Sequence, residues 1–159
     1  MTQRFWVLVR HAQAEARAAS GEDRERGLTE HGQRDAAAAA QFIARQLAGR
    51  SAVLLSSPAE RARSTAAPIA DLLDKPVHEQ DAIYDATPGD LLAILNEQNH
   101  PEASVLVGHN PGIEQALALL TEGRSDEYRG MPTAAVAWLQ VPEGVVEPGT
   151  ARLVAFWSP

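Results

Sequence analysis

Three continuous apolar runs, at residues 5–9, 53–55 and 105–107, stand out in the hydrophobic pattern of the chain. Each is rich in Val and Leu and does not alternate with polar residues, which is typical of strands buried on both faces of a parallel sheet. Two later runs, Ala134–Val141 and Ala151–Trp157, are joined through residues rich in Pro and Gly. Because proline cannot pair within a central strand, we expect these two to be antiparallel edge strands.

Apolar residues between these runs recur every three or four positions, which predicts amphipathic helices that pack on the sheet. We expect four helices, which begin near Thr29, Pro58, Pro88 and Pro111. The second is expected to end at about Leu73 and to precede a short strand at residues 77–79. The predicted core-facing positions of the helices are Leu28, Ala36, Ala40, Ile43, Leu47, Ala62, Ala66, Ile69, Leu72, Leu73, Leu91, Leu92, Leu95, Ile113, Leu117 and Leu120. Strands that alternate with helices predict an α/β fold, and no linker or repeat divides residues 1–159, so we expect a single domain.

Arginine and histidine side chains stand at the points where the predicted strands end. Arg10 and His11 come directly after the first run. Arg61 lies close behind the second, and His109 follows the third. The carboxyl ends of parallel strands meet at one edge of a sheet, where open α/β folds bind ligands. Because guanidinium groups fit phosphate or carboxylate and imidazole can act as nucleophile, base or cation, the sequence predicts a site for an anionic substrate.

Two of these turns also carry helix-start signals. Ser57, Pro58 and Glu60 match the N-cap, first and third positions of a capping box. Asn110 and Pro111 match an N-cap followed by the first helical position. Helix N-termini at these points would add oriented N–H groups and positive dipole ends to the predicted site.

Composition excludes several classes of function. The chain has 159 residues, of which 21 are acidic and 14 basic, and a formal charge of −7. This balance argues against a protein that binds nucleic acid or a membrane surface. No apolar stretch approaches the ~20 residues of a membrane span and no signal-like region precedes the first run, so we expect a cytoplasmic protein. The absence of cysteine excludes thiolate nucleophiles, disulfides and Cys-ligated zinc.

Three segments combine into one larger pattern: Arg10-His11-Ala12, Ser57–Ala62 and Gly108–Pro111. In this order and spacing they resemble the histidine phosphatase superfamily. The small size, the Arg-His-Ala form and the Leu28–Gly32 segment are similar to SixA-type phosphohistidine phosphatases. The resemblance implies a three-layer α/β/α fold with a mixed, mostly parallel central sheet, as in phosphoglycerate mutase-like proteins.

The resemblance also implies roles for four residues in a two-step phosphoryl transfer that uses no metal and no cofactor. His11 would become transiently phosphorylated. Arg10, Arg61 and a protonated His109 would bind the phosphoryl oxygens and stabilise the charge of the transferring group. All four are therefore predicted catalytic residues.

Two further residues have open roles. Arg26 matches a basic position of SixA-like sequences, where it would touch the phosphate, although a solvated surface arginine fits equally well. Asp85 lies roughly where relatives carry an acidic residue, and it is either a general acid or a residue that orders the loop before Pro88. The other histidines and Arg63 do not follow a predicted strand together with other candidate site residues. We expect them at the surface or at helix ends: His31, His78, His100 and Arg63.

The nature of the leaving group favours one substrate class. Imidazole leaves easily, with a pKa of ~6.5, whereas an alkoxide with a conjugate acid near ~15.7 needs a positioned acid. With a complete phosphate cradle and one uncertain acid, the sequence favours phosphohistidine on a phosphotransfer domain or phosphocarrier protein. The alternatives are a phosphatase of small phosphomonoesters, a metallohydrolase, and a phosphoprotein-binding module without turnover. The metallohydrolase is disfavoured because the chain lacks paired His/Asp ligand spacing.

Overall fold

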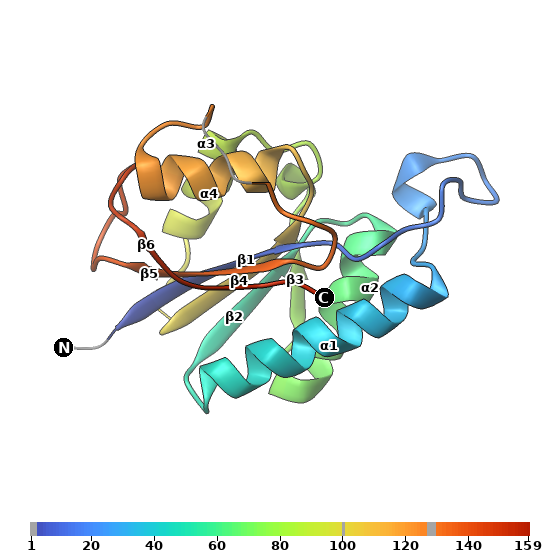
Figure 1. Ribbon diagram of the computed structural model, residues 1–159, viewed down its shortest axis with the longest axis horizontal. Helices are drawn as coiled ribbons and strands as arrows, with labels where there is room; N and C mark the ends of the chain where they lie inside the picture. Colours follow the sequence, from blue (N-terminus) through green and yellow to red (C-terminus); the bar gives the residue numbers. More distant parts are fainter. Residues whose placement is uncertain (1–2, 100, 127–129) are drawn as a thin grey trace.

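The computed structural model describes residues 3–99, 101–126 and 130–159. Within them a six-stranded sheet has the order β3-β2-β4-β1-β5-β6 (Figure 1). Its strands are β1 (Arg4–Arg10), β2 (Ala52–Ser56), β3 (Val77–Glu79), β4 (Ala103–Gly108), β5 (Val136–Val141) and β6 (Arg152–Trp157). The helices are α1 (Glu30–Leu47), α2 (Glu60–Leu73), α3 (Pro88–Asn96) and α4 (Gly112–Glu122), with single 3-10 turns η1 (Asp23–Glu25) and η2 (Asp81–Ile83).

The direction of the strands makes the sheet mixed and mostly parallel. β1 pairs with β4, and β2 pairs with both β3 and β4, all in parallel. β5 runs antiparallel to β1, and β6 runs antiparallel to β5. The two C-terminal strands are therefore antiparallel as predicted, but only β6 lies at the edge. The expectation of an edge position is wrong for β5, which lies between β1 and β6 because its Pro- and Gly-rich connection falls outside the strand itself.

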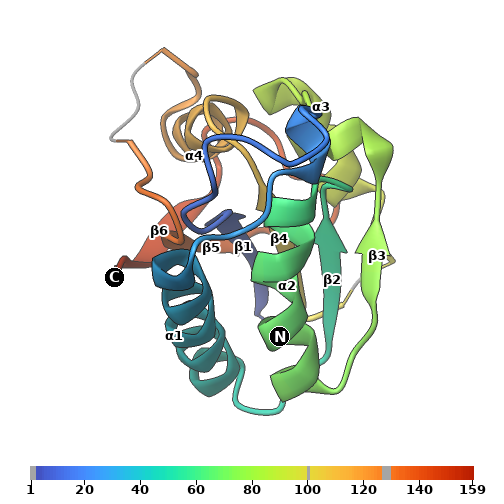
Figure 2. The ribbon, with the colours of Figure 1, turned by 90° about the vertical axis from the view of Figure 1, so that its right-hand side faces the viewer.

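Helices cover both faces of the sheet, with α1 and α2 on one side and α3 and α4 on the other (Figures 1 and 2). The alternating side chains of β1 divide between the two cores. Phe5, Val7 and Val9 pack among the apolar residues of α1 and α2. Trp6 and Leu8 pack among those of α3 and α4. This is the predicted three-layer α/β/α fold, and it makes the central strands apolar on both faces.

The helices agree with the predicted pattern at most positions. Thr29 caps α1 by accepting a hydrogen bond from the Gly32 backbone N–H at 2.9 Å, and all predicted core positions of that helix are buried. Leu72 is the exception in α2, because 53% of its surface is exposed. It lies in the last turn of the helix, where the next residue, Leu73, packs against the core instead. No helix among the described residues is long and apolar enough to cross a lipid bilayer.

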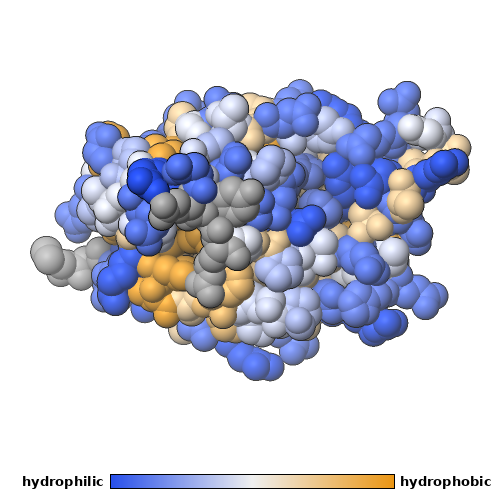
Figure 3. Space-filling view, turned by 45° about the horizontal axis from the view of Figure 1, so that its top comes forward, coloured by the Kyte–Doolittle hydropathy of each residue, from blue (hydrophilic) through white to orange (hydrophobic). Residues whose placement is uncertain are grey.

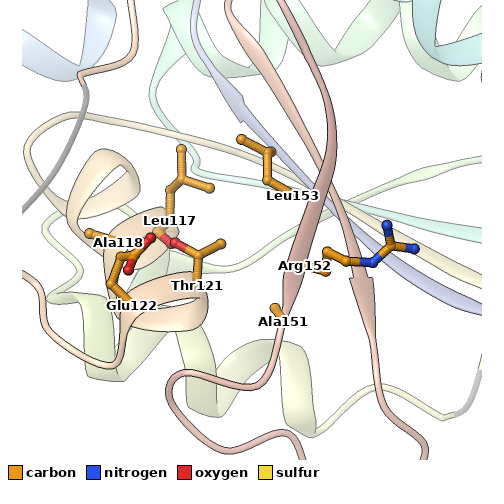
Figure 4. A pocket seen from close by; sticks show the side chains of 7 residues that line it. All are labelled: Leu117, Ala118, Thr121, Glu122, Ala151, Arg152 and Leu153. Carbon is orange, nitrogen blue, oxygen red and sulfur yellow. The ribbon is translucent and has the colours of Figure 1, made fainter.

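Hydrophilic side chains dominate the face shown in Figure 3, which also carries one apolar area. A cavity of about 350 Å³ lies between α4 and β6, where Leu117, Thr121 and Leu153 are among its lining residues (Figure 4). Arg152, on the same wall, lies opposite Gln140 of β5, and Gln140 in turn lies opposite Phe5 near the beginning of β1. This cavity is therefore at the opposite end of the sheet from Arg10.

Candidate active site

The predicted site residues converge because three parallel strands end at the same level. In the sheet register Arg10 lies opposite Gly108, and Ser56 lies opposite Val107. Past the strand ends, the His11 backbone N–H donates to the Gly108 carbonyl at 3.0 Å. The imidazole rings of His11 and His109 thereby come to lie 5.2 Å apart, measured between their centroids.

The hydrogen bond of His11 defines which of its ring nitrogens is available for chemistry. Nδ1 lies 2.7 Å from the backbone carbonyl oxygen of Ala12. A carbonyl can only accept, so Nδ1 carries the proton and Nε2 keeps its lone pair. α2 fixes the backbone next to His11, because the Ala12 backbone N–H donates to the Thr65 hydroxyl at 2.9 Å.

Electrostatics keep His11 uncharged. Burial is the main cause that lowers its pKa to about 4, against the opposing hydrogen bond to Ala12. The positive charges of Arg61, Arg10 and Arg26 lower the pKa further. At neutral pH His11 is therefore a neutral imidazole with a free Nε2, which is the form that a nucleophile requires.

His109 is held by Ser57, with 2.7 Å between its Nε2 and the serine hydroxyl oxygen. Its Nδ1 is buried and has no hydrogen-bond partner. Burial lowers the pKa of His109 to about 3, assisted by the charge of Arg61 and, in acid, by repulsion between two protonated rings because His11 lies beside it. Without a bound anion His109 is therefore neutral, and its predicted protonation beside a transferring phosphoryl group stays a prediction.

Arg61 and Arg10 supply the two guanidinium groups of the site. Arg61 lies in the first turn of α2 and is only 7% exposed. Arg10 donates from Nη1 to the Met131 carbonyl at 3.0 Å, while its Nε is buried without a partner. Burial lowers the pKa of Arg10, and the charge of Glu114 opposes this. The Arg10 Nε–H is thus an unpaired donor and His109 Nδ1 an unpaired ring nitrogen, and an oxyanion that reached them could accept from Arg10 and from a protonated His109.

Asp23 and Tyr84 belong to the site although the sequence pattern did not reveal them. Arg61 donates from Nη1 to the Asp23 carbonyl at 2.8 Å and from Nη2 to the Asp23 carboxylate at 2.9 Å. The Tyr84 hydroxyl donates to the same carboxylate, and the Tyr84 ring packs edge-on against His109 with centroids 5.6 Å apart. The hydrogen bond from Tyr84, followed by that from Arg26, holds the pKa of Asp23 well below its usual range. The same contact with Asp23 raises the pKa of Tyr84.

Arg26 lies next to the phosphate cradle but is occupied by protein groups. It donates from Nε to the Glu15 carbonyl at 2.7 Å and from Nη1 to Asp23 at 2.9 Å. The positive charge of Arg26 helps to lower the pKa of the His11 imidazole. The predicted contact of Arg26 with the substrate phosphate stays a prediction. The i, i+3 spacing of Asp23 and Arg26 suits a single helical turn and could have pointed to their pairing.

A cavity of about 310 Å³ opens beside His109. Arg61, Asp85 and the hydrogen-bonded pair of Asp23 and Tyr84 are among the other residues that line it. Asp85 is solvent-exposed at the rim of this cavity. It therefore lies within the same hollow as the phosphate-binding candidates, and its role as an acid stays a prediction.

The two predicted helix caps are wrong, because both helices begin later than the sequence predicts. α2 begins at Glu60 with Ala59 in the N-cap position, and Glu60 binds Arg63 and Ser64 rather than closing a capping box at Ser57. α4 begins at Gly112, one residue later than Pro111, which follows a cis peptide bond. The Ser57 hydroxyl contacts His109. The Asn110 side chain, the other predicted cap, donates to Glu114 at 3.0 Å.

The remaining predicted surface residues lie away from this cluster. His31 is exposed and pairs with Asp35 at 3.0 Å, and His78 is exposed on β3. Arg63 is exposed, as predicted, and forms an ion pair with Glu60. His100 lies outside the described residues.

Comparison with known proteins decides the family. The model of the histidine phosphatase superfamily (branch 1) matches residues 6–94, more than half of the chain. The chain belongs to the histidine phosphatase superfamily. A relative from Mycobacterium tuberculosis (strain ATCC 25618 / H37Rv), Uncharacterized protein Rv1276c, is 32% identical over 150 residues, which cover 86% of this chain and 91% of the relative.

Solved structures refine this position within the family. The protein assigned as phosphohistidine phosphatase SixA in Agrobacterium tumefaciens is 28% identical, with a TM-score of 0.81 and 98% of both chains covered. Its counterpart from Nakamurella multipartitia is 27% identical, also with a TM-score of 0.81, over 100% of this chain and 98% of that one. A protein histidine phosphatase SixA complexed with tungstate shares the fold at 23% identity and a TM-score of 0.81, over 98% of this chain and 97% of that one. Family and structural likeness together support phosphatase activity for this chain.

The donor set of the site is cationic rather than metal-binding. Among residues 3–99, 101–126 and 130–159 no group of three or more His, Asp or Glu side chains is arranged to hold a metal ion. The positive charges of Arg10 and Arg61 instead act on both His11 and His109 and lower their pKa values. This arrangement favours an anion as the ligand over a divalent cation.

Proposed function

We propose that this protein is a phosphohistidine phosphatase that passes the phosphoryl group through His11. The observation that carries the proposal is the hydrogen bond from His11 Nδ1 to the Ala12 carbonyl, at 2.7 Å. It leaves a neutral imidazole with a free Nε2 beside His109 and within reach of the positive charges of Arg61, Arg10 and Arg26. A nucleophile in its reactive form beside unpaired donors is the arrangement that phosphoryl transfer requires.

In the first step, His11 Nε2 attacks the phosphorus of the substrate. A P–Nε2 bond forms while the P–N bond to the substrate histidine breaks, and the electron pair of the broken bond stays on the substrate ring nitrogen. Arg10, through its free Nε, and Arg61 would stabilise the equatorial oxygens of the transferring group. Desolvation of the pocket strengthens these interactions, because both His11 and Arg61 are largely buried.

In the second step, water attacks the phosphorus of the phosphorylated His11. The P–Nε2 bond breaks, its electron pair returns to Nε2, and inorganic phosphate leaves with the oxygen and both protons of the water. The hydrogen bond at Nδ1 keeps the ring in one orientation through both steps. Once phosphate is present, its negative charge would favour protonation of His109, whose Nδ1 has no protein partner.

The class of substrate follows from the leaving group. A substrate histidine with its other ring nitrogen protonated departs as neutral imidazole, with a pKa of ~6.5. Such a leaving group departs without a proton from a strong general acid. The two carboxyl groups beside this pocket are consistent with a reaction that needs none. Asp23 is held ionised by Tyr84, Arg26 and Arg61. Asp85 is exposed at the rim. The expected partner is a phosphotransfer domain or phosphocarrier protein that presents its phosphohistidine to the pocket.

One observation favours a second candidate, a phosphatase of small phosphomonoesters that uses the same nucleophile. Asp85 lines the cavity together with His109, where it could protonate an alkoxide as that group departs. Under this alternative Asp85 would be essential for turnover. Under the first proposal it would be dispensable.

A substrate panel tests the proposed function. The wild-type protein is assayed in EDTA against phosphohistidine on phosphocarrier and phosphotransfer proteins, against free phosphohistidine, and against small phosphomonoesters. We expect kcat/KM to be highest for the protein-borne phosphohistidine and unchanged by EDTA. A preference for phosphomonoesters would replace the proposal by its alternative, and activity that needs added Mg²⁺ or Zn²⁺ would overturn both.

A further inference from the structure

Glu114 is a partly buried carboxylate for which the proposed chemistry has no role. It lies in the first turn of α4, two residues after Gly112. One carboxylate oxygen, Oε2, accepts from the Asn110 side-chain amide at 3.0 Å and from the Met131 backbone N–H at 3.3 Å. A single acidic oxygen therefore joins the turn after β4 to the segment before β5.

This pair of contacts continues to Arg10 through one peptide carbonyl. The Met131 carbonyl oxygen accepts from the Asn110 amide and from Arg10 Nη1, in both cases at 3.0 Å. Met131 is thus held at its N–H by Glu114 and fixes Arg10 with its carbonyl. The side chain of Met131 is 2% exposed, which leaves this segment little freedom to shift.

The orientation of the Asn110 amide is dictated by the same network. Its nitrogen Nδ2 faces a carboxylate and a carbonyl, and both of these can only accept. Both N–H groups are therefore directed to Glu114 and Met131, so the amide is held in one orientation. Removing the carboxylate would free the amide to rotate and would weaken its hold on the carbonyl that anchors Arg10.

Charge acts in the same direction as geometry. Burial disfavours the positive charge of Arg10, and the negative charge of Glu114 is the influence that supports it. Glu114 does not need to contact the guanidinium for this, because Coulomb interactions persist over several ångströms in a partly desolvated site.

We propose that Glu114 is a positioning residue, which fixes Arg10 for oxyanion binding through the Met131 peptide and the Asn110 amide. The inference rests on the proposed function in taking Arg10 as a phosphoryl-binding group. Glu114 lies on α4, at the other end of this hydrogen-bond network from Arg10, and touches neither substrate nor nucleophile. The effect of Glu114 should therefore depend entirely on the presence of the Arg10 side chain.

A double-mutant cycle read out by tungstate binding tests this inference. Tungstate affinity is measured by calorimetry for the wild type, Glu114→Ala, Arg10→Ala and the double variant, with circular dichroism to verify folding. We expect Glu114→Ala to weaken binding about tenfold, in the range for loss of a buried hydrogen-bond partner of a charged group. In the Arg10→Ala background the same change should weaken binding less than about twofold.

Two further variants separate charge and position from general damage. Glu114→Gln keeps an acceptor oxygen and should retain more affinity than Glu114→Ala; if the alanine variant does not fold, the cycle is run with glutamine. Glu122→Ala, at the exposed end of the same helix, is the matched control and should bind tungstate as the wild type does.

The results that overturn the inference differ from those that overturn the proposed function. Equal losses from the Glu114 change with and without Arg10, or no loss at all, would refute the positioning role. Absence of phosphohistidine hydrolysis by the wild type would refute the proposed function, and tungstate binding measures the Arg10–Glu114 coupling independently of turnover.

Discussion

The neutral, buried state of His11 should make the stability of the protein depend on pH in a defined window. His11 is 9% exposed, and its pKa is lowered from 6.5 to about 4, mainly by burial. In the unfolded chain the imidazole takes up a proton as the pH falls through 6.5, whereas in the folded protein it does so only near 4. The unfolded state therefore binds more protons between these values, and the folded state loses stability as the pH falls through this range.

The size of this effect follows from the two pKa values. A tenfold change in proton affinity corresponds to about 1.4 kcal/mol, so lowering the pH from 7 to 4.5 should cost about 2 kcal/mol through His11 alone. The assay is urea denaturation of the wild type and of His11→Ala at both pH values. The unfolding free energy of His11→Ala minus that of the wild type should be about 2 kcal/mol larger at pH 4.5 than at pH 7.

The control for this experiment is His78→Ala, since His78 is exposed on β3. Its difference from the wild type should be the same at both pH values. If His11→Ala behaves like His78→Ala, the imidazole of His11 is not held neutral in the folded protein, and the reasoning about its nucleophilic form is wrong.

Three further predictions address the other groups of the site. Arg61→Ala should lower kcat by roughly 10² to 10³, the usual cost of removing a preorganised donor from a transition state, and unchanged kcat would exclude Arg61 from the chemistry. Asp23→Asn should lower kcat/KM about tenfold, because Arg61 loses a hydrogen-bond partner; the effect is modest because half of the Asp23 side chain is solvent-exposed. Steady-state kinetics of Tyr84→Phe, measured in parallel, would show whether Tyr84 shares this role. Asp85→Asn should slow hydrolysis of an alkyl phosphomonoester by ~10² or more and barely change the rate on phosphohistidine, and an equal large loss on both substrates would contradict the leaving-group argument.

The strands and the catalytic cluster could be predicted from the sequence because they depend on local patterns. Continuous Val and Leu runs require burial on both faces, which fixes parallel central strands, and side chains just beyond such strands must meet at one sheet edge. Arg10 and His109 therefore come together without any knowledge of the loops between them. The family resemblance then gave these residues their roles.

The features that were missed depend on contacts between distant segments. Asp23 meets Arg61 and Tyr84 only when the η1 and η2 turns close over the end of α2, and no periodicity records this. The helix caps failed because α2 begins only at Glu60, so the Ser57 hydroxyl, which accepts from the Ala59 backbone N–H at 3.2 Å, lies outside the cap position and also contacts His109. The low pKa of His109 in the unliganded site could not be predicted either, because burial, its main cause, is a property of the assembled fold.

Trapping of the phosphoenzyme tests the central claim most directly. The wild type and His11→Ala are mixed briefly with a protein carrying radiolabelled phosphohistidine, quenched in alkali and separated by electrophoresis. The account predicts a label on the wild type that is stable in alkali, lost in acid, located at His11, and absent from the variant. Label on the His11→Ala variant, or rapid turnover by that variant without any label, would contradict it.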